Sequence, residues 1–153
     1  EFGQGHGISI GSEMSGNVTN VVFENFKMDK TERGPRVKSQ RGRGGLVANI
    51  TYKDISMKGV STGISISEYY NNDATGVAPV FRNIYIKNLT GSVTDQAGEF
   101  LCLPESPCYN ITLDEDDLTG YKQGFECEYA YGHATNTEPK SCLNTSDSSS
   151  SSL

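Results

Sequence analysis

Apolar and polar residues alternate in short stretches along this chain, and Gly, Asn and Asp separate one stretch from the next. Three stretches share a pattern of an Asn, an aliphatic residue, an apolar residue two positions later and a second Asn or Asp: NVVFENFKM at 20–28, NITYKDISM at 49–57 and NIYIKNLTG at 83–91. A weaker fourth copy, NITLDEDDL, begins at Asn110. Alternation with a period of two is typical of β-strands that bury one face. The pattern therefore predicts short strands and no long helix.

The copies recur at a regular spacing. Their leading asparagines lie 29, 34 and 27 residues apart and are Asn20, Asn49, Asn83 and Asn110. A second series keeps the same step, with GISIGS from 7, GPRVKS from 34 and GISISE from 63. A fixed period of this length is typical of solenoid proteins, in which each repeat stacks on the one before it. We therefore expect an all-β fold, a right-handed parallel β-helix, with the four asparagines stacked in one turn.

A β-sandwich with evenly spaced strands is the alternative architecture, because it too consists of short alternating strands. Two series with one period favour the β-helix. The length of 153 residues suits one domain, and we expect residues 1–142 to be coils of a β-helix. Residues 143–153, LNTSDSSSSSL, offer little to bury and are predicted to be a disordered Ser-rich tail.

Four cysteines lie in the C-terminal third of the chain, at Cys102, Cys108, Cys127 and Cys142. They form no CxxC motif and have no nearby histidine set, so the spacing does not indicate a zinc site, and we expect no metal and no cofactor. Two local disulfides, 102–108 and 127–142, fit the spacing best, with two other pairings left open. Disulfides indicate an oxidising compartment, and we expect a secreted, extracellular protein whose export signal lies upstream.

Asn-x-Ser/Thr sequons support the same compartment and occur at Asn17, Asn49, Asn88, Asn110 and Asn144. Three of them fall at the repeated polar positions, where we expect turn hydrogen bonds to occupy the amides. The remaining two, Asn17 and Asn144, are the expected glycan carriers. No apolar stretch approaches the roughly 18 residues that cross a bilayer, so we expect no membrane partner.

Positive charge is concentrated in RGPRVKSQRGR at 33–43, which holds five of the 13 basic residues of a chain whose net charge is −6. Val37 falls in register with Ile10 and Ile66 and is expected to point inward, so that Arg36 and Lys38 project together from the outer face. Like charges held side by side favour an anion between them. The alternative is a solvated basic face. Nucleic acid is not the expected partner, because the chain as a whole is acidic.

The same alignment makes Arg36 equivalent to Ser9 and Ser65, and Lys38 equivalent to Gly11 and Ser67. Small residues in the neighbouring coils leave an open shelf around the basic pair, since consecutive coils lie about 4.8 Å apart. Tyr69 is expected at the rim of this shelf, and His6 enters from the preceding turn. We therefore expect a cleft.

These motifs carry a resemblance. The chain resembles the polygalacturonase family of glycoside hydrolases, which degrade pectin, in three motifs: GHGISIGS at 5–12, RVK at 36–38 and a Tyr after the next aliphatic strand. The resemblance implies hydrolysis of α-1,4-galacturonosyl linkages with inversion. It implies that His6 lies beside the catalytic carboxylates, that Arg36 and Lys38 bind a galacturonate carboxylate, and that Tyr69 helps to form the same subsite, with Tyr70 as an adjacent competitor. GSEMSG at 11–16 and RGRGG at 41–45 resemble exo-acting members.

The chain departs from the family pattern at one point. The family's aspartate motifs, Asn-Thr-Asp and Asp-Asp, precede Gly-His-Gly, whereas this chain begins five residues before His6. We therefore expect the C-terminal half of the catalytic domain, with the catalytic aspartates in a missing N-terminal half and no activity from this piece alone. Asp116 and Asp117 form the only Asp-Asp pair and are expected in a solvated turn, and His133 is expected in a loop.

Two other functions fit the same residues. One is a non-catalytic β-helix that binds acidic polysaccharide. The other keeps the hydrolase but changes its substrate from pectic polygalacturonate to rhamnogalacturonan or xylogalacturonan.

Overall fold

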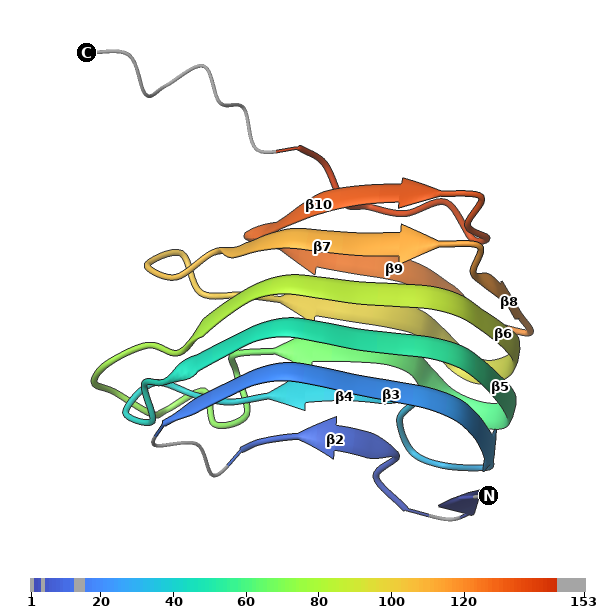
Figure 1. The fold of residues 1–153 in the computed structure, drawn as a ribbon, viewed down its shortest axis with the longest axis horizontal. Coiled ribbons are helices and arrows are strands. Elements are labelled where there is room, and N and C mark those ends of the chain that lie inside the picture. The colour runs from blue at the N-terminus through green and yellow to red at the C-terminus, as the bar shows by residue number, and fades with distance from the viewer. Residues whose placement is uncertain (1, 4, 13–15, 146–153) are drawn as a thin grey trace.

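The computed structural model describes residues 2–3, 5–12 and 16–145, and its regular elements are all strands (Figure 1). Among these residues there is no helix long and apolar enough to cross a membrane. The strands are β1 (Phe2–Gly3), β2 (Ile8–Ile10), β3 (Asn17–Asp29), β4 (Pro35–Lys38), β5 (Leu46–Ser67), β6 (Val80–Leu101), β7 (Cys108–Asp114), β8 (Asp117–Thr119), β9 (Gln123–Glu128) and β10 (Ala130–Thr135).

Every pair among these strands is parallel, which makes the fold a parallel β-helix. One row of strands runs in the order β1-β3-β5-β6-β7-β10. Behind it in Figure 1, β2 pairs with β4, β4 pairs with the second half of β5, and β9 pairs with the second half of β6. The predicted β-helix is confirmed and the β-sandwich is wrong, because sandwich strands pair antiparallel.

Each of the two central coils was expected to contain separate short strands, but the structure differs there. β5 and β6 are each one strand of 22 residues that bends from the front row to the back row (Figure 1). The register between β5 and β6 is irregular between Met57 and Thr62, but it is the same before and after this bend, from Leu46↔Val80 to Ser67↔Leu101.

The predicted asparagine ladder, Asn20, Asn49, Asn83 and Asn110, is present. Each amide after the first donates to the Oδ1 of the asparagine one coil before it, over 3.1, 3.1 and 2.9 Å in chain order. All four residues have φ between 55° and 59°, in the left-handed region. Asparagine tolerates this region better than most residues because its short side chain can hydrogen-bond locally. The ladder therefore sets one bend of every coil.

A second bend follows five residues later at Asn25, Asp54, Asn88 and Glu115, which also have positive φ. Asn88 Nδ2 donates to Asp54 Oδ1 over 2.9 Å. The amides of the sequons at Asn49, Asn88 and Asn110 thus donate within the bends, as expected.

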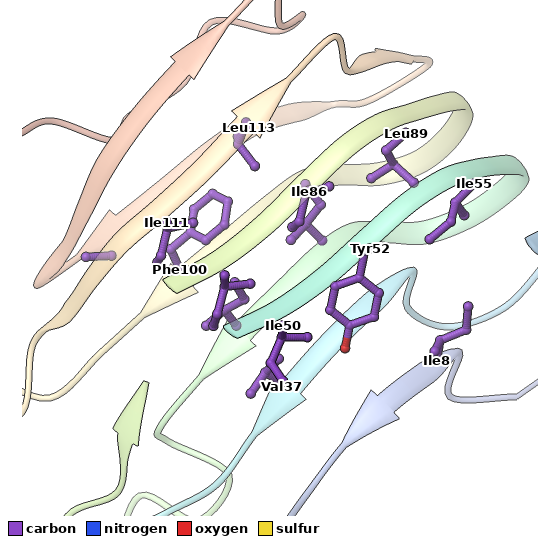
Figure 2. Close-up of a cluster of buried hydrophobic side chains, with 14 of the residues drawn as sticks. Ile8, Val37, Ile50, Tyr52, Ile55, Ile86, Leu89, Phe100, Ile111 and Leu113 are labelled. Atoms are coloured by element: carbon purple, nitrogen blue, oxygen red, sulfur yellow. The ribbon is translucent and has the colours of Figure 1, made fainter. Parts of the chain in front are cut away.

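The core lies between the rows and is built from stacked aliphatic and aromatic side chains (Figure 2). Four of these side chains are fully buried, namely Val37, Ile50, Ile86 and Phe100. Phe23 and Tyr52, register partners in β3 and β5, stack with ring centroids 4.9 Å apart. In-register stacking of apolar residues stabilises each coil through its neighbours.

The last coils carry both predicted disulfides, Cys102–Cys108 and Cys127–Cys142. Ordered structure continues past the predicted boundary at 142, because Leu143 is buried and Asn144 forms a parallel bridge with Tyr131. The remainder of the predicted Ser-rich tail, residues 146–153, lies outside the described residues.

Asn83 tests the ladder, since it donates to Asn49 and accepts from Asn110 while holding φ at 55°. Asn83→Gly removes the amide but tolerates the backbone, and we expect it to lower the free energy of unfolding by about 1–3 kcal/mol for two hydrogen bonds. Asn83→Ala adds the left-handed penalty of roughly 1–2 kcal/mol. Urea titration of both variants, with exposed Asn72→Ala as control, checks the order. Equal losses for Gly and Ala would contradict the backbone argument.

Candidate functional site

A cleft of about 330 Å³ lies on the outer face of the back row of strands. Its described walls are Arg33, Arg36, Lys38, Ser65, Ser67, Tyr69, Tyr70, Asn72, Glu99 and Leu101. These residues come from three successive coils and from the segment that follows β5. Three of the four sequence-predicted site residues, Arg36, Lys38 and Tyr69, therefore meet in one cleft.

Strand alternation places the basic pair. Val37 is fully buried and in register with Ile10 and Ile66, which turns Arg36 and Lys38 outward. The core also holds this strand from beneath, because the buried Tyr52 hydroxyl donates to the carbonyl oxygen of Arg36 over 3.1 Å. The expected shelf is confirmed above Arg36 by its register partner Ser65.

Arg36 lacks a counter-ion within the described structure. Burial lowers the pKa of its guanidinium, and the neighbouring Arg33 charge lowers it further, although Glu32 and Glu99 oppose this. The Nε of Arg36 is buried without a hydrogen-bond partner among the described residues. A buried donor without an acceptor costs free energy that an anion in the cleft would offset.

The two tyrosines after β5 take different positions in the cleft. Lys38 Nζ lies 4.8 Å from the ring centroid of Tyr70, a cation–π contact. Tyr69 instead donates its hydroxyl to Glu128 over 3.4 Å, and burial together with the Glu128 charge raises the pKa of Tyr69. Of the two candidates, Tyr70 is the one that contacts the basic pair.

Glu99 is a wall of the cleft, and two more carboxylates lie in the coil beyond it. Glu99 accepts a hydrogen bond from Ser65 over 2.7 Å and lies 3.9 Å from Arg33. Glu126 and Glu128 follow in the next coil, in register with Glu99 and Leu101. Glu99 was not predicted from the sequence, although its distance of 34 residues from Ser65 matches the repeat. The cleft therefore changes from positive to negative charge along the solenoid axis.

His6 lies in the turn before β2 and is not among the described cleft walls. Its Nδ1 is 2.6 Å from Glu32 Oε2, and Arg33 Nη1 lies 3.1 Å from the other oxygen of Glu32. Burial raises the pKa of Glu32, but the His6 hydrogen bond and the Arg33 charge outweigh it, so the pKa is lowered. Glu32, which sequence reasoning also missed, thus connects His6 to the edge of the cleft.

Glu68 is a buried acidic residue next to the cleft that was not predicted from the sequence. Alternation in SISEYY turns it inward between Ser67 and Tyr69, where it is 1% exposed. Burial raises its pKa to about 8, although a hydrogen bond from the backbone N–H of Leu103 acts against this. A protonated Glu68 therefore lies directly beneath the tyrosine segment of the cleft.

The Asp-Asp pair lies elsewhere, and the expectation of a solvated turn is wrong for Asp116. Asp116 is 1% exposed and accepts a hydrogen bond from the backbone N–H of Leu89 over 2.8 Å. Burial raises its pKa to about 7. Asp117 is exposed and pairs with Thr90. Asp116 thus caps the bend of the neighbouring coil and takes no part in the cleft.

No cluster of three or more His, Cys, Asp or Glu side chains suited to a metal ion occurs among the described residues.

Comparison with known proteins identifies the family. The sequence profile described as Glycosyl hydrolases family 28 matches residues 1–142. This chain belongs to glycosyl hydrolase family 28. A probable polygalacturonase from Arabidopsis thaliana is 32% identical to it over 92% of this chain, and endopolygalacturonase A from Aspergillus niger is 33% identical over 81%.

A solved structure supports the fold of this family 28 chain. The crystal structure of a hyperthermoactive exopolygalacturonase from Thermotoga maritima matches 92% of the chain with a TM-score of 0.79 and 29% identity. The expectation of a right-handed parallel β-helix is therefore confirmed. The chain spans only about a third of these proteins, namely 35% and 36% of the two relatives and 31% of the solved chain.

Glu68 makes the stability of this family 28 chain depend on pH. The folded state keeps the Glu68 proton up to about pH 8, whereas the unfolded chain releases it near the ordinary pKa of 4.5. Between these values the unfolded state binds fewer protons, so stability falls as pH rises. We expect Glu68→Gln to reduce this fall, measured by urea unfolding at about pH 5 and about pH 8. Exposed Glu138→Gln is the control, and an unchanged slope in Glu68→Gln would exclude the assignment.

Proposed function

We propose that this chain is the substrate-gripping part of a secreted polygalacturonase that hydrolyses α-1,4-galacturonosyl linkages in pectin. The observation that carries the proposal is the cluster of cations around Arg36 and Lys38, in which the buried Nε of Arg36 has no acceptor among the described residues. The names of the relatives support the substrate class, since they include polygalacturonases from plants and fungi. The two disulfides support secretion.

Arg36 and Lys38 have complementary roles in this proposal. A guanidinium can bind a uronate carboxylate through two parallel hydrogen bonds, and an ammonium adds a compact point charge. Tyr70, packed on Lys38, limits the movement of the ammonium. We assign the tyrosine of this subsite to Tyr70 in place of Tyr69, because Tyr69 is turned toward Glu128.

The acidic side of the cleft supports a defined position for the uronate. Glu99, Glu126 and Glu128 repel a carboxylate, while Arg33, Arg36 and Lys38 attract it. A galacturonate unit is therefore held at the basic end of the cleft. Its methyl ester carries no charge, so the two ends of the cleft neither attract nor repel it.

Catalysis requires a second set of residues. Inverting hydrolysis uses a carboxylic acid that protonates the leaving oxygen and a carboxylate that activates water, about 6.5–9.5 Å apart. We propose that residues 1–142 are C-terminal coils of a longer β-helix domain whose preceding coils supply both carboxylates. His6, held at Nδ1 by Glu32, has Nε2 left to hydrogen-bond one of them. The chain alone is then inactive.

Exo action is the mode that we favour. The motifs GSEMSG and RGRGG support it, as does the similarity to the Thermotoga maritima exopolygalacturonase, while the Aspergillus niger relative is named an endopolygalacturonase. A non-catalytic β-helix that binds acidic polysaccharide has the same cleft, and the residues upstream distinguish it. A rhamnogalacturonan or xylogalacturonan hydrolase is distinguished by its products.

The basic pair is tested by substitution in the longer protein that contains this chain. We expect Arg36→Gln and Lys38→Gln each to lower kcat/KM on polygalacturonate by roughly ten- to a hundredfold, the value of a charge-assisted hydrogen bond. Both variants should discriminate less than the parent between polygalacturonate and highly methylated pectin, because esterification removes the same charge.

Lys122→Gln, an exposed lysine outside the described cleft walls, is the matched control and should retain the parent's preference. If Arg36→Gln and Lys38→Gln also retain that preference, the pair is a solvated basic face and the site assignment fails.

The mode of action is tested by products. An exo-acting enzyme should release one short product from the earliest time points while the viscosity of polygalacturonate falls slowly. Size-exclusion analysis of the digest measures both. A broad ladder of intermediate oligomers at low conversion would establish endo action.

A further inference from the structure

A second groove lies on the opposite row of strands from the cleft. Its volume is about 280 Å³, and its described lining is Tyr109, Asn110, Tyr131, Gly132, His133 and Thr145. The lining comes from β7, from β10 and from the residues that follow Cys142. The expectation that His133 lies in a loop is wrong, because it stands in β10 in register with Thr112.

An aromatic pair forms one side of this groove. Tyr109 and Tyr131 stack with ring centroids 5.5 Å apart and an interplanar angle of 18°. Tyr109 is nevertheless 46% exposed, so part of the pair remains open to solvent. On the neighbouring strand β6, Tyr85 is 45% exposed and is in register with Thr112, which is itself buried and in register with His133. Exposed aromatic surface next to polar groups is typical of ligand sites.

An acceptor stands beside the aromatic pair. Asn110 is the last asparagine of the ladder, and its amide donates to Asn83. The Oδ1 of each earlier ladder asparagine accepts from the next coil, but that of Asn110 accepts no hydrogen bond within the described residues. Tyr131 lies in the following coil, where the ladder ends. A hydroxyl group of a ligand can donate to this oxygen.

The charge of the groove differs from that of the cleft. Its described lining contains no Asp, Glu, Lys or Arg, and the nearest cation by register is Arg82, the partner of Tyr109 on β6. A ligand with hydroxyl groups and an apolar ring face fits this lining whether or not it carries a carboxylate. A pyranose unit has both features.

We propose that the Tyr109–Tyr131 groove is a second polysaccharide-binding site, which stacks a pyranose unit of the pectic chain on the tyrosines and accepts a sugar hydroxyl at Asn110. The identity of the polymer rests on the proposed function, but the groove and the cleft recognise different features of it. The cleft requires the carboxylate. The groove is indifferent to esterification and holds the polymer on the far side of the solenoid.

The test measures retardation of the chain in native gels that contain highly methylated pectin. The chain is produced in a host without N-glycosylation, because the sequons at Asn110 and Asn144 border the groove. We expect Tyr109→Ala to weaken binding at least about fivefold, from the apolar contact that the ring loses. Tyr109→Leu should recover part of the affinity. Tyr121→Ala, which removes an exposed tyrosine elsewhere, should bind like the parent.

Arg36→Gln separates this proposal from the proposed function. It should weaken retardation in polygalacturonate gels and leave retardation in methylated pectin unchanged. If the retardation of Arg36→Gln in polygalacturonate gels equals that of the parent, the carboxylate-binding role of the cleft is contradicted and the groove proposal is not affected. If Tyr109→Ala binds methylated pectin like the parent, the proposed binding site in the groove is wrong. It is also wrong if Tyr109→Ala changes only self-association, measured by light scattering, because the groove would then be a protein interface.

Discussion

Register between coils is the constraint on which the rest of this structure depends. Parallel strands must bend at the same residue in every coil, or the inter-coil hydrogen bonds of the next straight segment are lost. The asparagine ladder meets this demand with a left-handed backbone and an amide that is both donor and acceptor. Because one bend is in register, the buried and exposed positions of the following strands are in register as well.

The cleft is a direct consequence of that register. Arg36 and Lys38 are separated by a buried Val37, and small serines in the next coil leave space above them. One coil further along the same row stands Glu99, so the charge of the surface changes within two coils. Outward residues at equivalent positions of successive coils can therefore differ in charge, so the electrostatic potential changes along the solenoid axis while the core stays the same.

The inner face of the same strands supports the cleft. Tyr52 reaches through the core to the carbonyl of Arg36, and Glu68 lies beneath the tyrosine segment with Leu103 as donor. Both groups are buried, and burial disfavours their ionised forms. The back row thus presents its charges above the neutral, buried side chains of Tyr52 and Glu68, while the front row presents an aromatic groove.

The sequence by itself determined the repeat, its period and the bends, since a positive φ favours Asn at fixed positions and alternation separates inward from outward residues. It therefore predicted the β-helix, the ladder and the outward Arg36 and Lys38, and the cysteine spacing favoured the two disulfides that the structure contains. It did not reveal the partners of individual side chains. Three contacts depend on turn geometry and on distances between coils: the contact of Tyr70 with Lys38, the hydrogen bond of Glu32 with His6, and the cap that Asp116 forms on a buried bend. Only the tertiary structure decides these, because residues about 30 positions apart come into contact when the solenoid closes each turn.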